Sequence, residues 1–150
     1  MKTEIQTTID NLRELASHAE AYYEANDPSR FDMTAFKAVY GKDENGSKEL
    51  EGEFDRGEDV PEEYECKTSC CLLGIADLAG MGENVPGDFL TLSDALFPIF
   101  EADESCSREE HTEQWNSLFG AHLPSDMGAR VAGLRFAADE LERTGRYIPA

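Results

Sequence analysis

The chain has 150 residues, a length typical of one domain that folds without a metal or disulfide. Its 32 acidic residues outnumber its 13 lysines and arginines, which gives a net charge of −19. This charge argues against a nucleic-acid binder and against docking on anionic membranes, because both need a basic face. Apolar residues make up 40% of the chain, which argues against a wholly disordered acidic protein.

The first predicted element is a helix over residues 3–25. Apolar residues recur along it at steps of three and four, which places them on one face: Ile5, Ile9, Leu12, Ala16, Ala19 and Tyr23. The turn signal Asn26-Asp27-Pro28 ends this helix. The aromatic residues of segment 31–36 are expected to hold the following connection against the core.

Residues 41–65 break the helical pattern. They include 11 acids against three bases, a net charge of −8, and glycines and a proline interrupt them at short intervals. Leu50, Phe54 and Val60 are the few apolar anchors. We predict a long solvated acidic loop here, with a loose hairpin as the alternative.

A buried helix is predicted over residues 70–81. Thr68 or Ser69 can serve as its N-cap, since a side-chain hydroxyl accepts a hydrogen bond from the first turn. Gly80 and Gly82 end it, because glycine readily adopts the left-handed conformation found after helices.

Two further helices are predicted before residue 120. Ser93 can cap a short helix over residues 94–102, which Pro98 shortens or kinks. The next helix starts at a capping box formed by Ser107 and Glu110 and runs to Phe119.

The last predicted helix covers residues 126–144, with Ser125 as N-cap and Gly145 at the C-terminal cap. Its apolar face consists of Met127, Val131, Leu134, Ala138 and Leu141. No convincing strand alternation is present. The expected fold is therefore all-α, with about five helices around one core in a single domain over residues 1–150, and an acidic excursion at 41–65.

Several of these segments resemble a family of small helical proteins of phages and bacteria. The matching stretches are Phe31-Asp32-Met33-Thr34-Ala35-Phe36, Cys66-Lys67-Thr68-Ser69-Cys70-Cys71-Leu72-Leu73-Gly74-Ile75-Ala76, Trp115-Asn116-Ser117-Leu118-Phe119 and the helix after Ser125. The chain departs from the family at Lys67, where the family usually has glycine, and in its longer, more acidic segment 41–65. The resemblance implies a helical scaffold of phage or mobile-element origin, and it carries over no particular activity to this chain.

The acidic segment is the candidate functional surface. Its expected partner-binding residues are Glu49, Glu51, Glu53, Asp55, Glu58, Asp59, Glu62 and Glu63. A secondary acidic patch consists of Glu101, Asp103, Glu104, Glu109, Glu110 and Glu113. Duplex DNA presents one negative charge per about 1.7 Å of its axis, so arrayed carboxylates can occupy a basic channel that normally holds DNA.

This pattern favours an inhibitor encoded by a phage or mobile element. It would bind a host defence protein, such as a CRISPR effector or a restriction enzyme, directly and without binding nucleic acid itself. The start of the chain lacks a secretory signal and no apolar run is long enough to span a membrane, so a cytoplasmic location is expected. The alternative is a non-inhibitory accessory or structural phage protein whose acidity serves solubility.

The cysteines suggest a second alternative, a zinc-binding regulator. The weak candidate ligands are Cys66, Cys70, Cys71 and Cys106, with His111 nearby in the sequence. Their spacing is unlike the paired Cys-x-x-Cys pattern of zinc sites, so packing of the thiols is favoured and no cofactor is expected. No nucleophile elbow, phosphate-binding loop or metalloprotease motif occurs in the chain. We therefore predict that the protein is not an enzyme.

Overall fold

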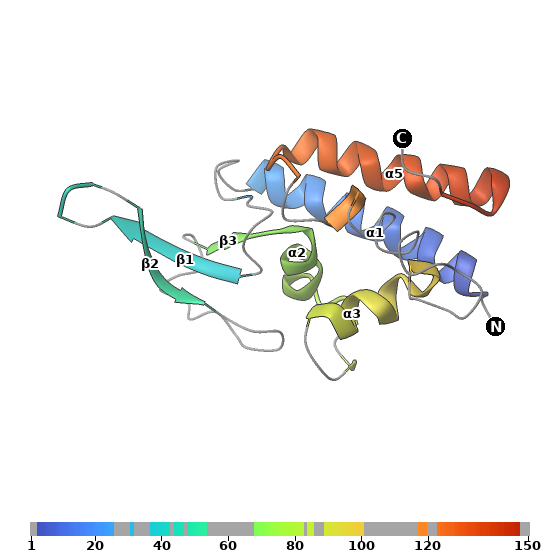
Figure 1. The fold of residues 1–150 in the computed structure, drawn as a ribbon, viewed down its shortest axis with the longest axis horizontal. Helices are drawn as coiled ribbons and strands as arrows, with labels where there is room; N and C mark the ends of the chain where they lie inside the picture. Colours follow the sequence, from blue (N-terminus) through green and yellow to red (C-terminus); the bar gives the residue numbers. More distant parts are fainter. Residues whose placement is uncertain are drawn as a thin grey trace.

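The structure, a computed structural model, describes residues 3–25, 31, 37–42, 44–46, 48–53, 68–82, 84–85, 89–100, 117–119 and 123–147. Most of these residues are helical, which confirms the predicted all-α class. The helices are α1 (Glu4–Ala25), α2 (Leu72–Leu78), α3 (Phe89–Leu96), the short 3-10 helix η3 (Pro98–Phe100) and α5 (Met127–Thr144). A small sheet of β1 (Lys37–Lys42), β2 (Lys48–Glu53) and β3 (Thr68–Cys70) extends from this helical body (Figure 1).

Helices α1 and α5 lie side by side and run in opposite directions (Figure 1). The Thr3 hydroxyl accepts a hydrogen bond from the Gln6 backbone N–H at 3.1 Å and so satisfies one donor of the first turn of α1. The predicted apolar face of α5 is buried along its whole length. In α1 the predicted face is buried from Ile9 to Ala19, whereas Ile5 is 37% exposed.

Helices α2, α3 and η3 pack against α1 and complete the core (Figure 1). The rings of Phe97 and Phe119 stack with their centroids 5.1 Å apart. The Asn11 side chain donates a hydrogen bond to the Leu96 backbone carbonyl at 2.8 Å, which satisfies an acceptor at the end of α3. One continuous apolar cluster thus joins the described helices.

The predicted starts of two helices are wrong. Thr68 and Ser69 do not cap α2, because they form strand β3, and Cys71 precedes the helix without a side-chain capping bond. Ser93 is not a cap either, since it lies within α3, where it is 1% exposed. In both places pairing and packing outweigh the local preference of a hydroxyl side chain for a cap position.

The predicted helix over residues 94–102 lies too late in the chain, because α3 covers only residues 94–96 of that range and η3 covers 98–100, whereas α5 agrees closely with its prediction. Helix α3 ends at Leu96, two residues before Pro98, which lacks a backbone N–H and begins η3. The N-cap of α5 is Asp126 rather than Ser125, and its carboxylate accepts a hydrogen bond from the Ala129 N–H at 3.3 Å. Gly145 adopts the left-handed conformation that was expected at the other end. The predicted capping box at residues 107 and 110 lies outside the described residues.

The acidic segment contains part of a hairpin, which was the alternative to a loop. The strand order in the sheet is β2-β1-β3, and both pairings are antiparallel. The β1–β2 ladder shifts register between Val39 and Tyr40, as at a β-bulge, and Gly46 in the connecting turn has a φ of 79°. The hairpin begins at Lys37, before the segment 41–65, and the rest of that segment from residue 54 lies outside the described residues.

Candidate partner-binding surface

Three of the predicted partner-binding acids lie on one strand. Glu49, Glu51 and Glu53 are all in β2, and Glu53 is exposed. The other five predicted residues of this surface lie outside the described residues: Asp55, Glu58, Asp59, Glu62 and Glu63. So does the whole secondary patch: Glu101, Asp103, Glu104, Glu109, Glu110 and Glu113.

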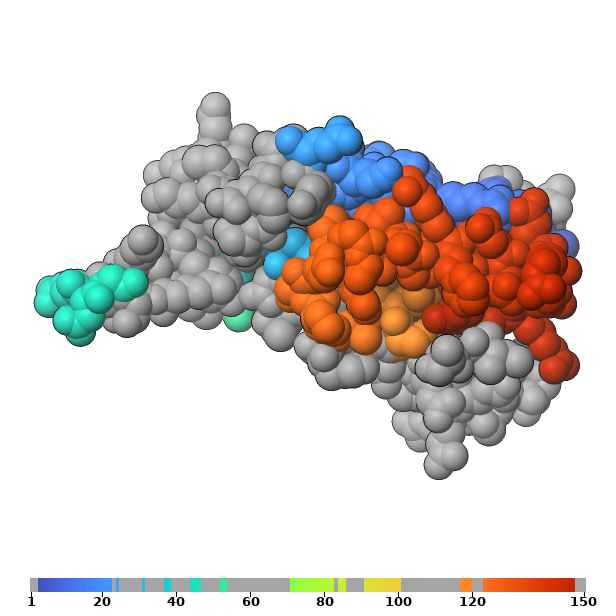
Figure 2. All heavy atoms as spheres, turned by 90° about the horizontal axis from the view of Figure 1, so that it is seen from above, coloured from blue at the N-terminus to red at the C-terminus, as the bar shows by residue number. Residues whose placement is uncertain are grey.

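The hairpin extends away from the helices. Strand β2 is at the edge of the described sheet, with β1 as its neighbour. The turn residues 44–46 are exposed and lie at the end of the molecule farthest from α5 (Figures 1 and 2). A partner approaching this end would meet the acidic strand before the helical body.

A buried ion pair attaches the hairpin to the helices. The Lys37 ammonium in β1 lies 2.6 Å from a carboxylate oxygen of Asp77 in α2. Only 1% of the Lys37 side chain and 12% of the Asp77 side chain are exposed. Burying a charge is unfavourable unless an opposite charge meets it, so the carboxylate of Asp77 stabilises the buried Lys37 ammonium. The sequence held no signal for this pair, because α2 lies about forty residues beyond β1 in the chain.

The helical body neutralises much of its own charge. Arg135 of α5 donates to both carboxylate oxygens of Glu20 in α1, at 2.7 and 3.0 Å. Arg13 of α1 donates to Asp139, at 3.0 Å, and to Glu142. These hydrogen bonds hold the pKa of Glu20 below its usual range and raise the pKa of both arginines.

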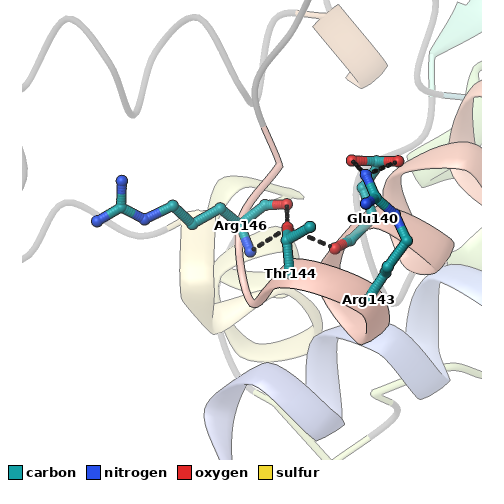
Figure 3. Close-up of polar contacts among 4 residues, drawn as sticks. All are labelled: Glu140, Arg143, Thr144 and Arg146. Carbon is teal, nitrogen blue, oxygen red and sulfur yellow. Dashed lines mark hydrogen bonds and ion pairs between the residues drawn. The ribbon is translucent and has the colours of Figure 1, made fainter.

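A further arginine–carboxylate pair lies near the C-terminal end of α5. Arg143 donates to both carboxylate oxygens of Glu140, at 2.8 and 2.9 Å (Figure 3). The Thr144 hydroxyl lies within hydrogen-bond distance of the Glu140 and Arg146 carbonyls, and its single proton can serve one of them at a time. The Arg146 guanidinium points away from these three side chains (Figure 3).

The negative charge of the chain is therefore unevenly distributed. Helix α5 holds three arginines and three acids, a net charge of zero. Segments 41–65 and 101–116 have net charges of −8 and −5, and together account for −13 of the −19. The excess negative charge is concentrated in two segments, one of which contributes β2 to the hairpin.

A surface hollow of about 660 Å³ lies between α1 and α5. Its lining combines apolar and charged side chains, with Phe136, which is 55% exposed, beside the Arg135–Glu20 pair. The sequence did not predict this hollow, since Phe136 is outside the apolar face of α5.

The weak metal candidates are not brought together in the part of the chain that the structure describes. Cys71 is half-buried against the core, and Cys70 is the last residue of β3. Cys66, Cys106 and His111 lie outside the described residues. Among the described side chains, no three histidines, cysteines or acids are placed to share a metal ion. None of the described helices is long and apolar enough to cross a membrane.

Comparison with protein-family models, with curated proteins and with solved structures found no match. The resemblance to small phage and bacterial proteins stays a prediction. The functional argument therefore rests on the charge distribution and on the geometry of the hairpin.

Proposed function

We propose that this protein binds a partner with a basic, nucleic-acid-binding surface, and that the acidic hairpin makes the contact. The observation that carries the proposal is the uneven distribution of charge. Four acids of the helical body pair with arginines, and α5 is neutral, whereas the largest excess of negative charge is concentrated in segments such as 41–65. A protein that needs acidity only for solubility gains nothing from collecting its charge in this way.

The binding mechanism follows from the partner's chemistry. Lysines and arginines that normally hold phosphates would form charge-assisted hydrogen bonds with the carboxylates of the hairpin. Each exposed pair contributes only about 0–1 kcal/mol, so affinity requires many pairs acting together. The concentrated charge would also accelerate the encounter by electrostatic steering.

The target class we favour is a host defence protein, such as a CRISPR effector or a restriction enzyme. This protein would then be a phage or mobile-element inhibitor that acts in the cytoplasm of the bacterial host and does not itself bind nucleic acid. The acidic segment and the resemblance to small phage proteins support this choice. The competing class is an accessory protein whose acidity serves solubility.

Capture from a bacterial lysate at low salt, with release by a salt step and identification by mass spectrometry, tests the proposal. The released protein should bind nucleic acid, and the purified chain should inhibit that binding. Affinity should fall steeply as salt rises to about 0.15 M, where the Debye length is about 8 Å.

A pair of charge-reversed variants separates the hairpin from net charge. The variant E49K/E51K/E53K should lose capture, because it reverses three acids of β2. The control E4K/E24K/D94K makes the same change in net charge at exposed positions of α1 and α3 and should retain capture. Equal loss in both variants would favour a general effect of acidity, and retention in both would contradict the proposal.

A further inference from the structure

Lys37 is an unusual residue to find in the interior. It is among the largest fully buried side chains, and the others in that group are apolar apart from a threonine. A buried ammonium restricts the fold, because it must meet an opposite charge at hydrogen-bond distance. Asp77 supplies that charge from α2, 2.6 Å away.

The ladder that places the sheet against the helices is short. Strand β3 has three residues, and its pairs with β1 are Lys37 with Cys70, Ala38 with Ser69 and Val39 with Thr68. Backbone hydrogen bonds can form again after a slip of one residue. A ladder of three pairs therefore specifies its register weakly. A slip of β1 by one residue would turn the Lys37 side chain to the opposite face of the sheet and separate its charge from that of Asp77.

Two of the strand side chains that the structure describes are buried, Lys37 and Ala38. Among the described strand side chains, Ala38 is buried at 2% exposure but is too small to distinguish one register from another. Of these two buried side chains, Lys37 with its ion pair to Asp77 makes the more selective contact.

We propose that the Lys37–Asp77 ion pair selects the β1–β3 register and thereby sets the direction in which the hairpin presents its acids. Since β2 pairs only with β1 in the described sheet, its position follows that of β1. The consequence for partner binding rests on the proposed function, whereas the register can be measured without any partner.

Nuclear magnetic resonance of the double variant K37M/D77L tests the proposal. These apolar side chains approximate the volume of the originals and remove both charges, so the helical body should stay folded. We expect the cross-strand contact between Ala38 and Ser69 to be joined by contacts of a second register. Amide exchange in β1 and β3 should accelerate at least about tenfold, while α1 and α5 remain unchanged.

The matched control is R135M/E20L, which removes an ion pair between α1 and α5 at positions that are 47% and 45% exposed. It should leave the contacts of β1 and β3 as in the wild type. If K37M/D77L does not fold, K37M/D77N gives the same test, since it also removes both charges and keeps the shape of the Asp77 side chain.

A single wild-type register with unchanged exchange in the charge-free variants would overturn the proposal. Wild-type protein supplies a second check. Protons of a buried, paired Lys37 ammonium should exchange slowly, and exchange as fast as that of an exposed lysine would also overturn it. Failure of partner capture would count against the proposed function and leave the measured register standing.

Discussion

The ion pair of Arg135 and Glu20 is a single contact that makes the stability of the helical body depend on pH. The hydrogen bonds from Arg135 lower the pKa of Glu20, so the ionised carboxylate is favoured in the folded state. The resulting stabilisation is fully present above the pKa that Glu20 has in the unfolded chain. It is lost as the pH falls through the lower pKa of the folded state.

Replacing Arg135 with glutamine should therefore raise the pKa of Glu20 toward its usual range. A titration of the Glu20 side-chain carboxyl by nuclear magnetic resonance measures this change. R143Q, which removes the partner of Glu140 instead, serves as the control and should leave Glu20 unaffected. If Glu20 titrates identically with and without Arg135, the pair does not form in solution.

Two glycines with similar backbone conformations should respond differently to alanine. Gly82 and Gly145 have φ angles of 67° and 76°, so a side chain at either position costs about 1–2 kcal/mol. A Cβ at Gly82 would lie 2.7 Å from a methyl carbon of Leu92, which is fully buried, whereas nothing lies within 4 Å of one at Gly145. G82A should lose a further 1–3 kcal/mol, roughly the cost of overpacking.

Urea denaturation of the two variants measures the difference in unfolding free energy. Since the backbone conformation is matched, G145A is the control for strain alone. Equal losses would mean that the chain around Leu92 gives way and that packing there is loose.

At the element scale, the start of α5 tests the capping geometry. The Asp126 carboxylate accepts a hydrogen bond from the Ala129 N–H, so D126A should destabilise the protein by about 0.5–2 kcal/mol. S125A should cost less, because Ser125 lies one residue before the N-cap. Thermal unfolding of both variants decides between the two residues. A larger loss of stability in S125A than in D126A would identify Ser125 as the N-cap.

Helices were more predictable than strands for a physical reason. A helix repeats its apolar residues over several turns, so the buried faces of α1 and α5 can be predicted from the local sequence. Caps depend on one residue, and neighbouring candidates such as Ser125 and Asp126 are locally equivalent. Strand β2 contains three glutamates and one glycine among its six residues, and both types have low strand propensity, so it forms because β1 pairs with it.

At the scale of the whole molecule, a net charge of −19 implies repulsion within the folded chain. Three acids lie close together along β2, so replacing them with glutamine should relieve repulsion. We expect E49Q/E51Q/E53Q to melt at the same temperature as wild type or higher in low salt. The rise in melting temperature on adding salt should be smaller in this variant.

The same variant should bind the captured partner less tightly. Melting curves from low salt to about 0.15 M, beside binding measurements, show whether these acids serve binding at the expense of stability. A variant that melts lower than wild type at every salt concentration would show instead that the acids support the hairpin.

The helical class, the apolar faces of the long helices and the concentration of acids in segment 41–65 could all be predicted from the amino-acid sequence, because periodicity and composition are local properties. Tertiary contacts, by contrast, make part of this segment an edge strand of the described sheet and bring Lys37 of β1 against Asp77 of α2. They also pair Arg13 and Arg135 with acids of the facing helix. Pairing between distant segments depends on which surfaces the fold brings together, and no local sequence pattern predicts those contacts.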